Sequence, residues 1–421
     1  MREFDALDTA IKGLAPVTSV AVADVTDYGA VGNGTTNCTA AIAAAIAAVG
    51  SFGTVYFPPG VFAHTGIVVP TGSSGVSIAG AGVRMTTLKN THASNVSISL
   101  HGAGAGAYIP GTTLRDLTID ATAVHSGQVA VDVLLAQSFD VARVEILNHG
   151  VGLSHRASWE NLYQDVHIHN CTIGWQFPAP GAYTASCPVT LVGCHAGDCG
   201  TGVIVADGLQ AMSWVGGDLS RCGVGVVLEG SQTGQLSFTG LNFEGITGDD
   251  ISVGSTAGPA GVTFNGCRFF YEAGSKTRSV HFTIGDQLQF INCRWTGYTL
   301  VARQEDTSGA MTMVGCGGYG YTHFVDLAGV YSDTAPVLVS SAGGGISGYG
   351  PGSNAIAGSV KANQWLATKV LYGAGKVTVS DGDFSTPPVE GAMCGVYNTS
   401  DSTFRFAIRD YGAWKVTAPL T

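Results

Sequence analysis

The chain has 421 residues and a formal net charge of −11, with 61 glycines and only 12% charged residues. A negative balance argues against nucleic acid as a partner, because nucleic-acid recognition needs basic patches. Few charges and many glycines suit tightly coiled strands better than a helical protein, and a solenoid of this length can form one continuous body.

The first 22 residues lie outside the pattern that follows and predict a short helix from Phe4 to Leu14, closed by Gly13 and Pro16. This segment lacks the apolar core of a secretory signal, and the chain has no 18-residue apolar run. We therefore expect no membrane insertion. We predict that residues 1–22 attach the protein to a partner or join its copies, with a loosely packed tail as the alternative.

A helix and a strand are predicted next. Thr35 or Thr36 is a candidate N-cap, and the alanine-rich stretch from Ala40 to Val49 predicts a helix that Gly50 ends. The run from Val55 to Phe57 then predicts a strand.

These residues carry a resemblance to a known family. The string DYGAVGNG from Asp27, the alanine-rich helix and GTVYFPPG from Gly53 resemble the opening of pectate-lyase-like right-handed β-helix proteins, and LRDLTID from Leu114 resembles their first regular coil. The resemblance implies that a helix at 36–49 covers the end of the solenoid, and that Asp27 and Asn33 are structural turn and cap residues. The family usually has an acidic pair before this helix, where this chain has Asn37 and Cys38.

One pattern recurs every 22 to 28 residues through the middle of the chain. Its copies begin at Leu114, Val141, Tyr163, Leu191, Trp214, Phe238, Phe264, Phe290 and Met313. Such a period predicts a solenoid. Within each copy apolar and polar residues alternate, as in a strand buried on one face, and glycine-rich turns follow. The sequence therefore predicts an all-β protein whose residues 23–330 form a right-handed parallel β-helix.

The register of the repeat also predicts which side chains point into the core and which point to the surface. The chain has ten cysteines, and one inward column holds four of them: Cys194, Cys267, Cys293 and Cys316. We interpret them as small buried apolar residues, because no CxxC pair suggests a zinc site. Free thiols in this number favour folding in a reducing cytoplasm. We expect no metal and no cofactor.

The repeat predicts one outward ladder rich in titratable groups. Its members are Thr118, Glu145, His167, His195, Asp218, Asn242, Arg268 and Arg294, with flanking ladders that hold Asp116, Arg143, Asp165 and Asn292 on one side and Asp120, His169, Ser220, Glu244 and Phe270 on the other. We interpret this surface as a glycan-binding groove, against the alternative that these residues are only a solvated strand face. Trp159, Trp175 and Trp214 are candidate sugar-stacking aromatics, and Trp159 is included in the predicted site.

Glycoside hydrolysis needs two carboxyl groups roughly 5 to 9.5 Å apart. Asp218 and Glu244 lie on adjacent coils and two positions apart, which places their backbones on the order of 8 Å from each other. We predict this pair to be catalytic, with Asp165, Glu145 and Asp116 as alternative members, against the alternative that all of them are surface carboxylates. A polysaccharide lyase would instead use His195 or Tyr271 as the base, with Arg268 and Arg294 binding a uronate carboxylate.

After about Asp326 the repeat fades, and residues 331–421 predict a small β-rich region. Its segments TPPVEGAM from Thr386 and GAWK from Gly412 resemble C-terminal pieces of phage tail-fibre and tailspike proteins. That likeness implies a homotrimer in a virion tail that binds, and in the enzymatic case depolymerises, a bacterial surface polysaccharide. A free, secreted lyase or glycosidase and a non-catalytic β-helix are the alternatives.

Overall fold

The computed structural model describes most of the central chain and shorter parts beyond it. The described residues are 21–304, except 72, 180, 184–185, 207, 230–234, 255–260, 273–275 and 283–287, and then 311–314, 316–319, 323–327, 338–340, 370–373, 393–398, 403–410 and 413–416. The predicted helix from Phe4 to Leu14 lies outside them.

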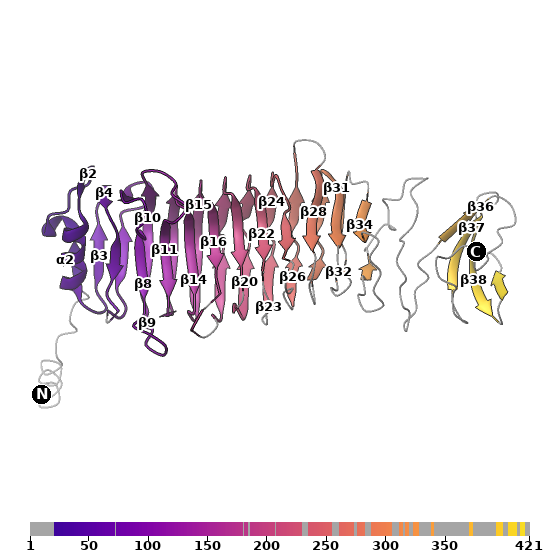
Figure 1. Cartoon of the computed structure of the whole chain (residues 1–421), viewed down its shortest axis with the longest axis horizontal. Helices are drawn as coiled ribbons and strands as arrows, with labels where there is room; N and C mark the ends of the chain where they lie inside the picture. The colour runs from indigo at the N-terminus through magenta and orange to yellow at the C-terminus, as the bar shows by residue number, and fades with distance from the viewer. Residues whose placement is uncertain are drawn as a thin grey trace, which may run out of the picture.

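The described chain forms a parallel β-helix, which confirms the predicted fold class (Figure 1). One sheet, sheet B, takes one strand from each coil. Its strands are β5 (Ile67–Val69), β8 (Ile98–His101), β11 (Val129–Leu134), β14 (Val151–Arg156), β16 (Ile173–Phe177), β19 (Thr201–Val205), β22 (Val224–Leu228), β25 (Ile251–Val253), β28 (Lys276–Phe282), β31 (Tyr298–Gln304) and β34 (His323–Leu327). All their pairings are parallel, as a coiled chain requires.

The second sheet, sheet A, bends along its length into two arms. The first arm holds β1 (Val22–Asp24), β3 (Thr54–Phe57), β6 (Ser77–Gly80), β17 (Val189–Val192), β20 (Ala211–Val215), β23 (Gln235–Thr239), β26 (Val262–Asn265), β29 (Leu288–Ile291), β32 (Met311–Val314) and β35 (Leu338–Ser340). The second arm holds β2 (Asn33–Asn37), β4 (Gly60–His64), β7 (Thr86–Asn90), β18 (His195–Gly197), β21 (Asp218–Ser220), β24 (Asn242–Glu244), β27 (Arg268–Phe270), β30 (Arg294–Thr296) and β33 (Gly317–Tyr319). Three long strands, β10 (Thr113–Ala121), β13 (Asp140–Leu147) and β15 (Asn161–His169), run through both arms. Because β35 pairs with β32, sheet A continues past residue 330, where the sequence placed its end.

A column of left-handed residues makes the bend between the arms. Their φ angles lie between 50° and 65°, at Asp116, Arg143, Asp165, Gly193, Gly216, Gly240, Gly266 and Asn292. Glycine, asparagine and aspartate tolerate this conformation best. The sequence had placed Asp116, Arg143, Asp165 and Asn292 on an ordinary flanking ladder, but backbone geometry sets their position.

Stacked inward columns fill the core. Phe238, Phe264 and Phe290 stack on successive coils with ring centroids 4.7 and 5.2 Å apart. Trp175 and Trp214, predicted to stack on sugars, are fully buried in this core, so that prediction was wrong for both. Trp175 and Trp214 occupy inward positions of β16 and β20, and the position of a residue near a strand start does not by itself decide its face. The four cysteines of the predicted column are buried as expected.

Helix α2 (Thr39–Val49) lies over the N-terminal end of the stack, at the indigo end of Figure 1. It begins later than predicted, and Thr35 and Thr36 belong to β2. The N-cap is instead Cys38, which makes no side-chain capping hydrogen bond, and the preceding Asn37 accepts hydrogen bonds at Oδ1 from the Thr39 amide and hydroxyl. Asn33 is a turn residue as predicted, since its Oδ1 accepts from the amides of Thr35 and Thr36.

The remaining elements are short. They are η1 (Val25–Tyr28), the paired strands β9 (Ile109–Pro110) and β12 (Ala136–Gln137), and a C-terminal sheet of β36 (Val370–Gly373), β37 (Met393–Asn398), β38 (Thr403–Asp410) and β39 (Ala413–Val416). Pairing is antiparallel from β37 to β39, so this region is β-rich without continuing the coil pattern. In the part of the chain described here, no helix is both long and apolar enough to cross a membrane.

Candidate functional site

The predicted ladder exists in the structure with the predicted register. Strand pairing connects Thr118 to Glu145, His167, His195, Asp218, Asn242, Arg268 and Arg294 in that order. All of these residues lie on the second arm of sheet A. We call this row the polar ladder.

Two carboxyl groups of the second arm influence each other. Asp218 pairs with Asn242, and Ser220 pairs with Glu244, so the two acids lie one coil and two residues apart. Burial, and then the charge of Glu244, raise the pKa of Asp218 from 3.8 to about 6. Asp218 thus holds a proton more readily than an ordinary aspartate, which is a property that a general acid needs.

Unpaired oxygens point to a ligand at the same place. Asp218 Oδ1 and Asn242 Oδ1 are buried without a hydrogen-bond partner among the described residues. The amide nitrogen of Asn242 donates to Glu244 Oε2 at 3.0 Å, which orients both side chains. Buried polar atoms in native proteins normally have partners, so hydroxyl groups of a bound sugar would suit these oxygens.

Histidines border the acid pair. The ring of His195 lies 4.6 Å from that of His169 and 5.7 Å from that of His167, and its Nδ1 is 3.7 Å from Asp218 Oδ1. Burial, and then the neighbouring histidines, lower the pKa of His195 to about 4, so the ring is neutral near pH 7. Gly197 makes room for it, because a Cβ there would approach His195 Nε2 to 2.5 Å.

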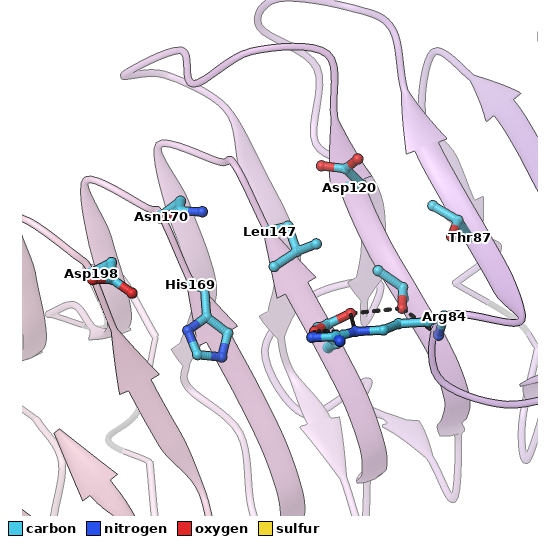
Figure 2. A pocket seen from close by; sticks show the side chains of 9 residues that line it. Arg84, Thr87, Asp120, Leu147, His169, Asn170 and Asp198 are labelled. Atoms are coloured by element: carbon cyan, nitrogen blue, oxygen red, sulfur yellow. Dashed lines mark hydrogen bonds and ion pairs between the residues drawn. The ribbon is translucent and has the colours of Figure 1, made fainter. Parts of the chain in front are cut away.

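A hollow of about 400 Å³ opens beside these histidines on the N-terminal coils (Figure 2). It is lined by Arg84, Thr87, Thr118, Asp120, Glu145, Leu147, His169, Asn170 and Asp198. Hydroxyl, amide and carboxylate groups predominate, and such groups form hydrogen bonds to sugar hydroxyls. The hollow and the acid pair therefore lie on the same arm, within a few coils.

An ion pair forms one wall of the hollow. Arg84 Nε and Nη2 donate to Glu145 Oε1 at 3.0 and 2.6 Å, and Thr118 also donates to this carboxylate. Burial would raise the pKa of Glu145, but the bonds from Arg84 outweigh it, and the pKa is lowered. Glu145, predicted to bind substrate, is thus held ionised and fixed in place.

Other predicted site residues lie apart from the acid pair. Asp165 occupies the bend column, with its Oδ1 over Gly193, two coils before Asp218. Trp159 donates to the hydroxyl of Tyr108 and forms a bridge with Gln137, away from the polar ladder. The structure therefore does not bring these two residues to the pair. His195 and Asn242 lie on the coils directly before and after Asp218, and His167 lies one coil beyond His195.

Sequence reasoning missed five residues of the hollow: Arg84, Thr87, Leu147, Asn170 and Asp198. Arg84 lies in a turn before the regular repeat, where no register places a side chain. Asn170 and Asp198 follow β15 and β18 in a second left-handed column. Aligning the copies one position further would have shown a column of Asn148, Asn170, Asp198 and Arg221. Among the described residues no group of three histidine, cysteine or acidic side chains is placed to hold a metal ion.

A family comparison agrees with the sequence resemblance at the N-terminal end. Residues 22–105 match the sequence model of the family described as rhamnogalacturonase A/epimerase, pectate lyase-like. This stretch contains α2 and the first coils up to β8. No curated protein matches the chain in sequence.

Several solved structures are similar to this chain at low identity. The tailspike protein of Acinetobacter baumannii phage AM24 is 17% identical, with a TM-score of 0.49 over 72% of this chain and 54% of that one. The ORF18 protein of Geobacillus virus E2 is 15% identical, with a TM-score of 0.47 over 70% of this chain and 62% of that one. The A-module of the mannuronan C-5 epimerase AlgE4 of Azotobacter vinelandii is 19% identical, with a TM-score of 0.46 over 75% of this chain and all of that one. The chain spans less than two thirds of both viral proteins.

Proposed function

We propose that this protein is tailspike- or tail-fibre-like and that it binds and hydrolyses a bacterial surface polysaccharide along the polar ladder. The observation that carries the enzymatic part is the raised pKa of Asp218 beside Glu244. The match of residues 22–105 to a pectate-lyase-like family and the hollow beside the ladder support a carbohydrate ligand.

The geometry suits hydrolysis with inversion. Asp218, protonated at mildly acidic pH, would donate its proton to the leaving glycosidic oxygen, while Glu244 would activate a water molecule on the other face of the sugar. Inverting enzymes hold the two carboxyl groups roughly 6.5 to 9.5 Å apart, and one coil with a two-residue offset separates these two backbones by about 8 Å. His195, which is neutral near pH 7, would hydrogen-bond to sugar hydroxyls.

The direct test incubates the protein with surface polysaccharides purified from candidate host bacteria. We expect new reducing ends without the ultraviolet absorbance of unsaturated uronates, because hydrolysis leaves no double bond. Rising absorbance would show elimination and transfer the role of base to His195. Retention of a polysaccharide with neither signal would identify a binder without catalysis.

The pair itself is tested by isosteric variants. Asp218→Asn and Glu244→Gln should each lower kcat by about 100-fold or more, the usual contribution of a general acid or base. Binding of the same polysaccharide should remain. Glu160→Gln, an exposed acid outside the ladder, is the matched control and should keep full activity. Equal activity in all three variants would exclude the pair.

Three further parts of this proposal rest on the sequence alone. They are the place of the protein in a virion, its homotrimeric state and its attachment through residues 1–22. Light scattering on the full chain should give three times the monomer mass. A monomer that still cleaves polysaccharide would favour a free carbohydrate-active enzyme.

A further inference from the structure

Arginines divide into two groups by their partners. Six of the eight described arginine side chains form an ion pair with a carboxylate: Arg84, Arg115, Arg143, Arg156, Arg221 and Arg278. Arg268 and Arg294 have no carboxylate within ion-pair distance in the described part of the chain. Both are exposed, and both belong to the polar ladder.

The two unpaired arginines are also neighbours. Arg268 on β27 pairs directly with Arg294 on β30, so two positive charges sit one strand spacing apart, about 4.8 Å at the backbone. Like charges directly opposite each other destabilise a sheet. In a chain of net charge −11, with carboxylates available for six other arginines, this arrangement is unfavourable unless an anion lies over it.

The pair is partly pre-organised for a ligand. The guanidinium of Arg268 lies 4.6 Å from the ring centroid of Phe270, two residues along the same strand. Stacking on an aromatic ring restricts a guanidinium and leaves its N–H edges free to donate. Guanidinium groups fit carboxylate and phosphate oxygens in a two-pronged geometry.

We propose that Arg268 and Arg294 form an anion-binding subsite of the polar ladder, and that the polysaccharide carries an acidic group, a carboxylate or a phosphate. Arg268 is two coils from Asp218, roughly 10 Å at the backbone. The acidic group would therefore sit one or two sugar units from the bond that is cleaved. This inference rests on the proposed function. It adds that the substrate is negatively charged and that its acidic group lies one or two sugar units from the cleaved bond.

The first experiment uses the polysaccharide that the protein retains or cleaves, in three forms: native, carboxyl-reduced and dephosphorylated. Loss of at least tenfold in affinity after carboxyl reduction assigns the anion to a uronate or similar sugar. The same loss after dephosphorylation assigns it to a phosphate. Equal affinity for all three forms overturns the subsite but leaves the proposed function standing, whereas failure to bind any polysaccharide of the panel removes the proposed function itself.

Two double variants test whether binding depends on these two arginines or only on the total positive charge of the protein. Arg268→Gln/Arg294→Gln should weaken binding of the native form at least tenfold and remove most of its salt dependence. Arg115→Gln/Arg143→Gln removes two exposed, ion-paired arginines of sheet A and serves as the matched control with little effect. Equal losses in both double variants would overturn the proposal.

A thermal measurement needs no polysaccharide. If the two arginines bind an anion and repel each other in its absence, Arg294→Gln should raise Tm, because it removes the repulsion with Arg268. Inorganic tripolyphosphate should raise Tm of the unmodified protein and not that of Arg268→Gln/Arg294→Gln. A lower Tm for Arg294→Gln, together with no response to tripolyphosphate, would show a structural role and overturn the subsite.

Discussion

Asp218 shows how one side chain acquires a chemical role from its surroundings. It lies on an outward ladder, yet the neighbouring coils bury much of it, and Glu244 adds a negative charge nearby. Both effects disfavour the ionised form. The ionised carboxylate of Asp218 therefore lowers the stability of the fold, as is common for side chains with a functional role.

This cost predicts a pH-dependent effect on stability. The pKa of Asp218 is raised in the folded state, so the folded protein holds the proton more tightly and gains stability as pH falls from above 6 toward 3.8. At about pH 8, Asp218→Asn should raise the free energy of unfolding on the order of 1 kcal/mol, allowing for solvent screening of this partly exposed group.

Urea unfolding at several pH values measures this difference. The gain should disappear near the acidic end of the range, where the native carboxyl is protonated in both states. The exposed Asp165→Asn is the control and should show no such gain. A variant less stable than the native protein in alkali would mean that the Asp218 carboxylate is stabilising.

At the scale of the element, the bend between the two arms of sheet A positions the polar ladder. From β10 to β30, each coil crosses this bend through a left-handed residue two positions before its polar-ladder residue. In the coil that carries Asp218, Gly216 and Gly217 both have positive φ. A Cβ on Gly217 would meet the backbone oxygen of Cys194 at 1.9 Å, whereas one on Gly240 in the next coil would meet nothing within 4 Å.

Two glycine variants on adjacent coils should therefore differ strongly. Gly240→Ala should lower the free energy of unfolding by only about 1 to 2 kcal/mol, because alanine is strained in a left-handed backbone conformation. Gly217→Ala must also push two coils apart, and we expect a larger loss of stability together with loss of activity at Asp218. Thermal unfolding and the polysaccharide assay measure both. Equal effects of the two variants would contradict the close contact.

For the whole molecule, stability depends on covering the N-terminal end of the stacked coils. An open solenoid end exposes an apolar cross-section and unpaired strand edges, to which another chain can add. Helix α2 covers this end with Ile42, Ala45, Ile46 and Val49, all buried.

A charged side chain on the buried face of α2 should detach the helix and expose the N-terminal end of the stacked coils. Ile46→Asp should destabilise the fold by several kcal/mol, because it removes buried apolar area and buries a carboxylate. It should also increase aggregation, measured by light scattering on heating. Ala44→Asp, on the exposed face of α2, is the control with little effect. Comparable aggregation of the two variants would show that α2 does not protect the end.

The sequence by itself determined the fold and the register of the ladder. Strands in a β-helix stack at one fixed spacing with alternating faces, so aligning the copies was enough to place Glu145, Asp218 and Arg294 on one row. A family resemblance added the capping helix, with an error of a few residues at its start.

Tertiary structure alone decided the chemistry of that row. The ion pair between Arg84 and Glu145, the burial of Trp214 and the raised pKa of Asp218 depend on turns and on neighbouring coils. None of these has a periodic signal, because a repeat specifies where a residue lies along a strand but not how loops and adjacent side chains desolvate or pair it. Side-chain environment, which sets proton affinity and binding, appears only when the coils are stacked.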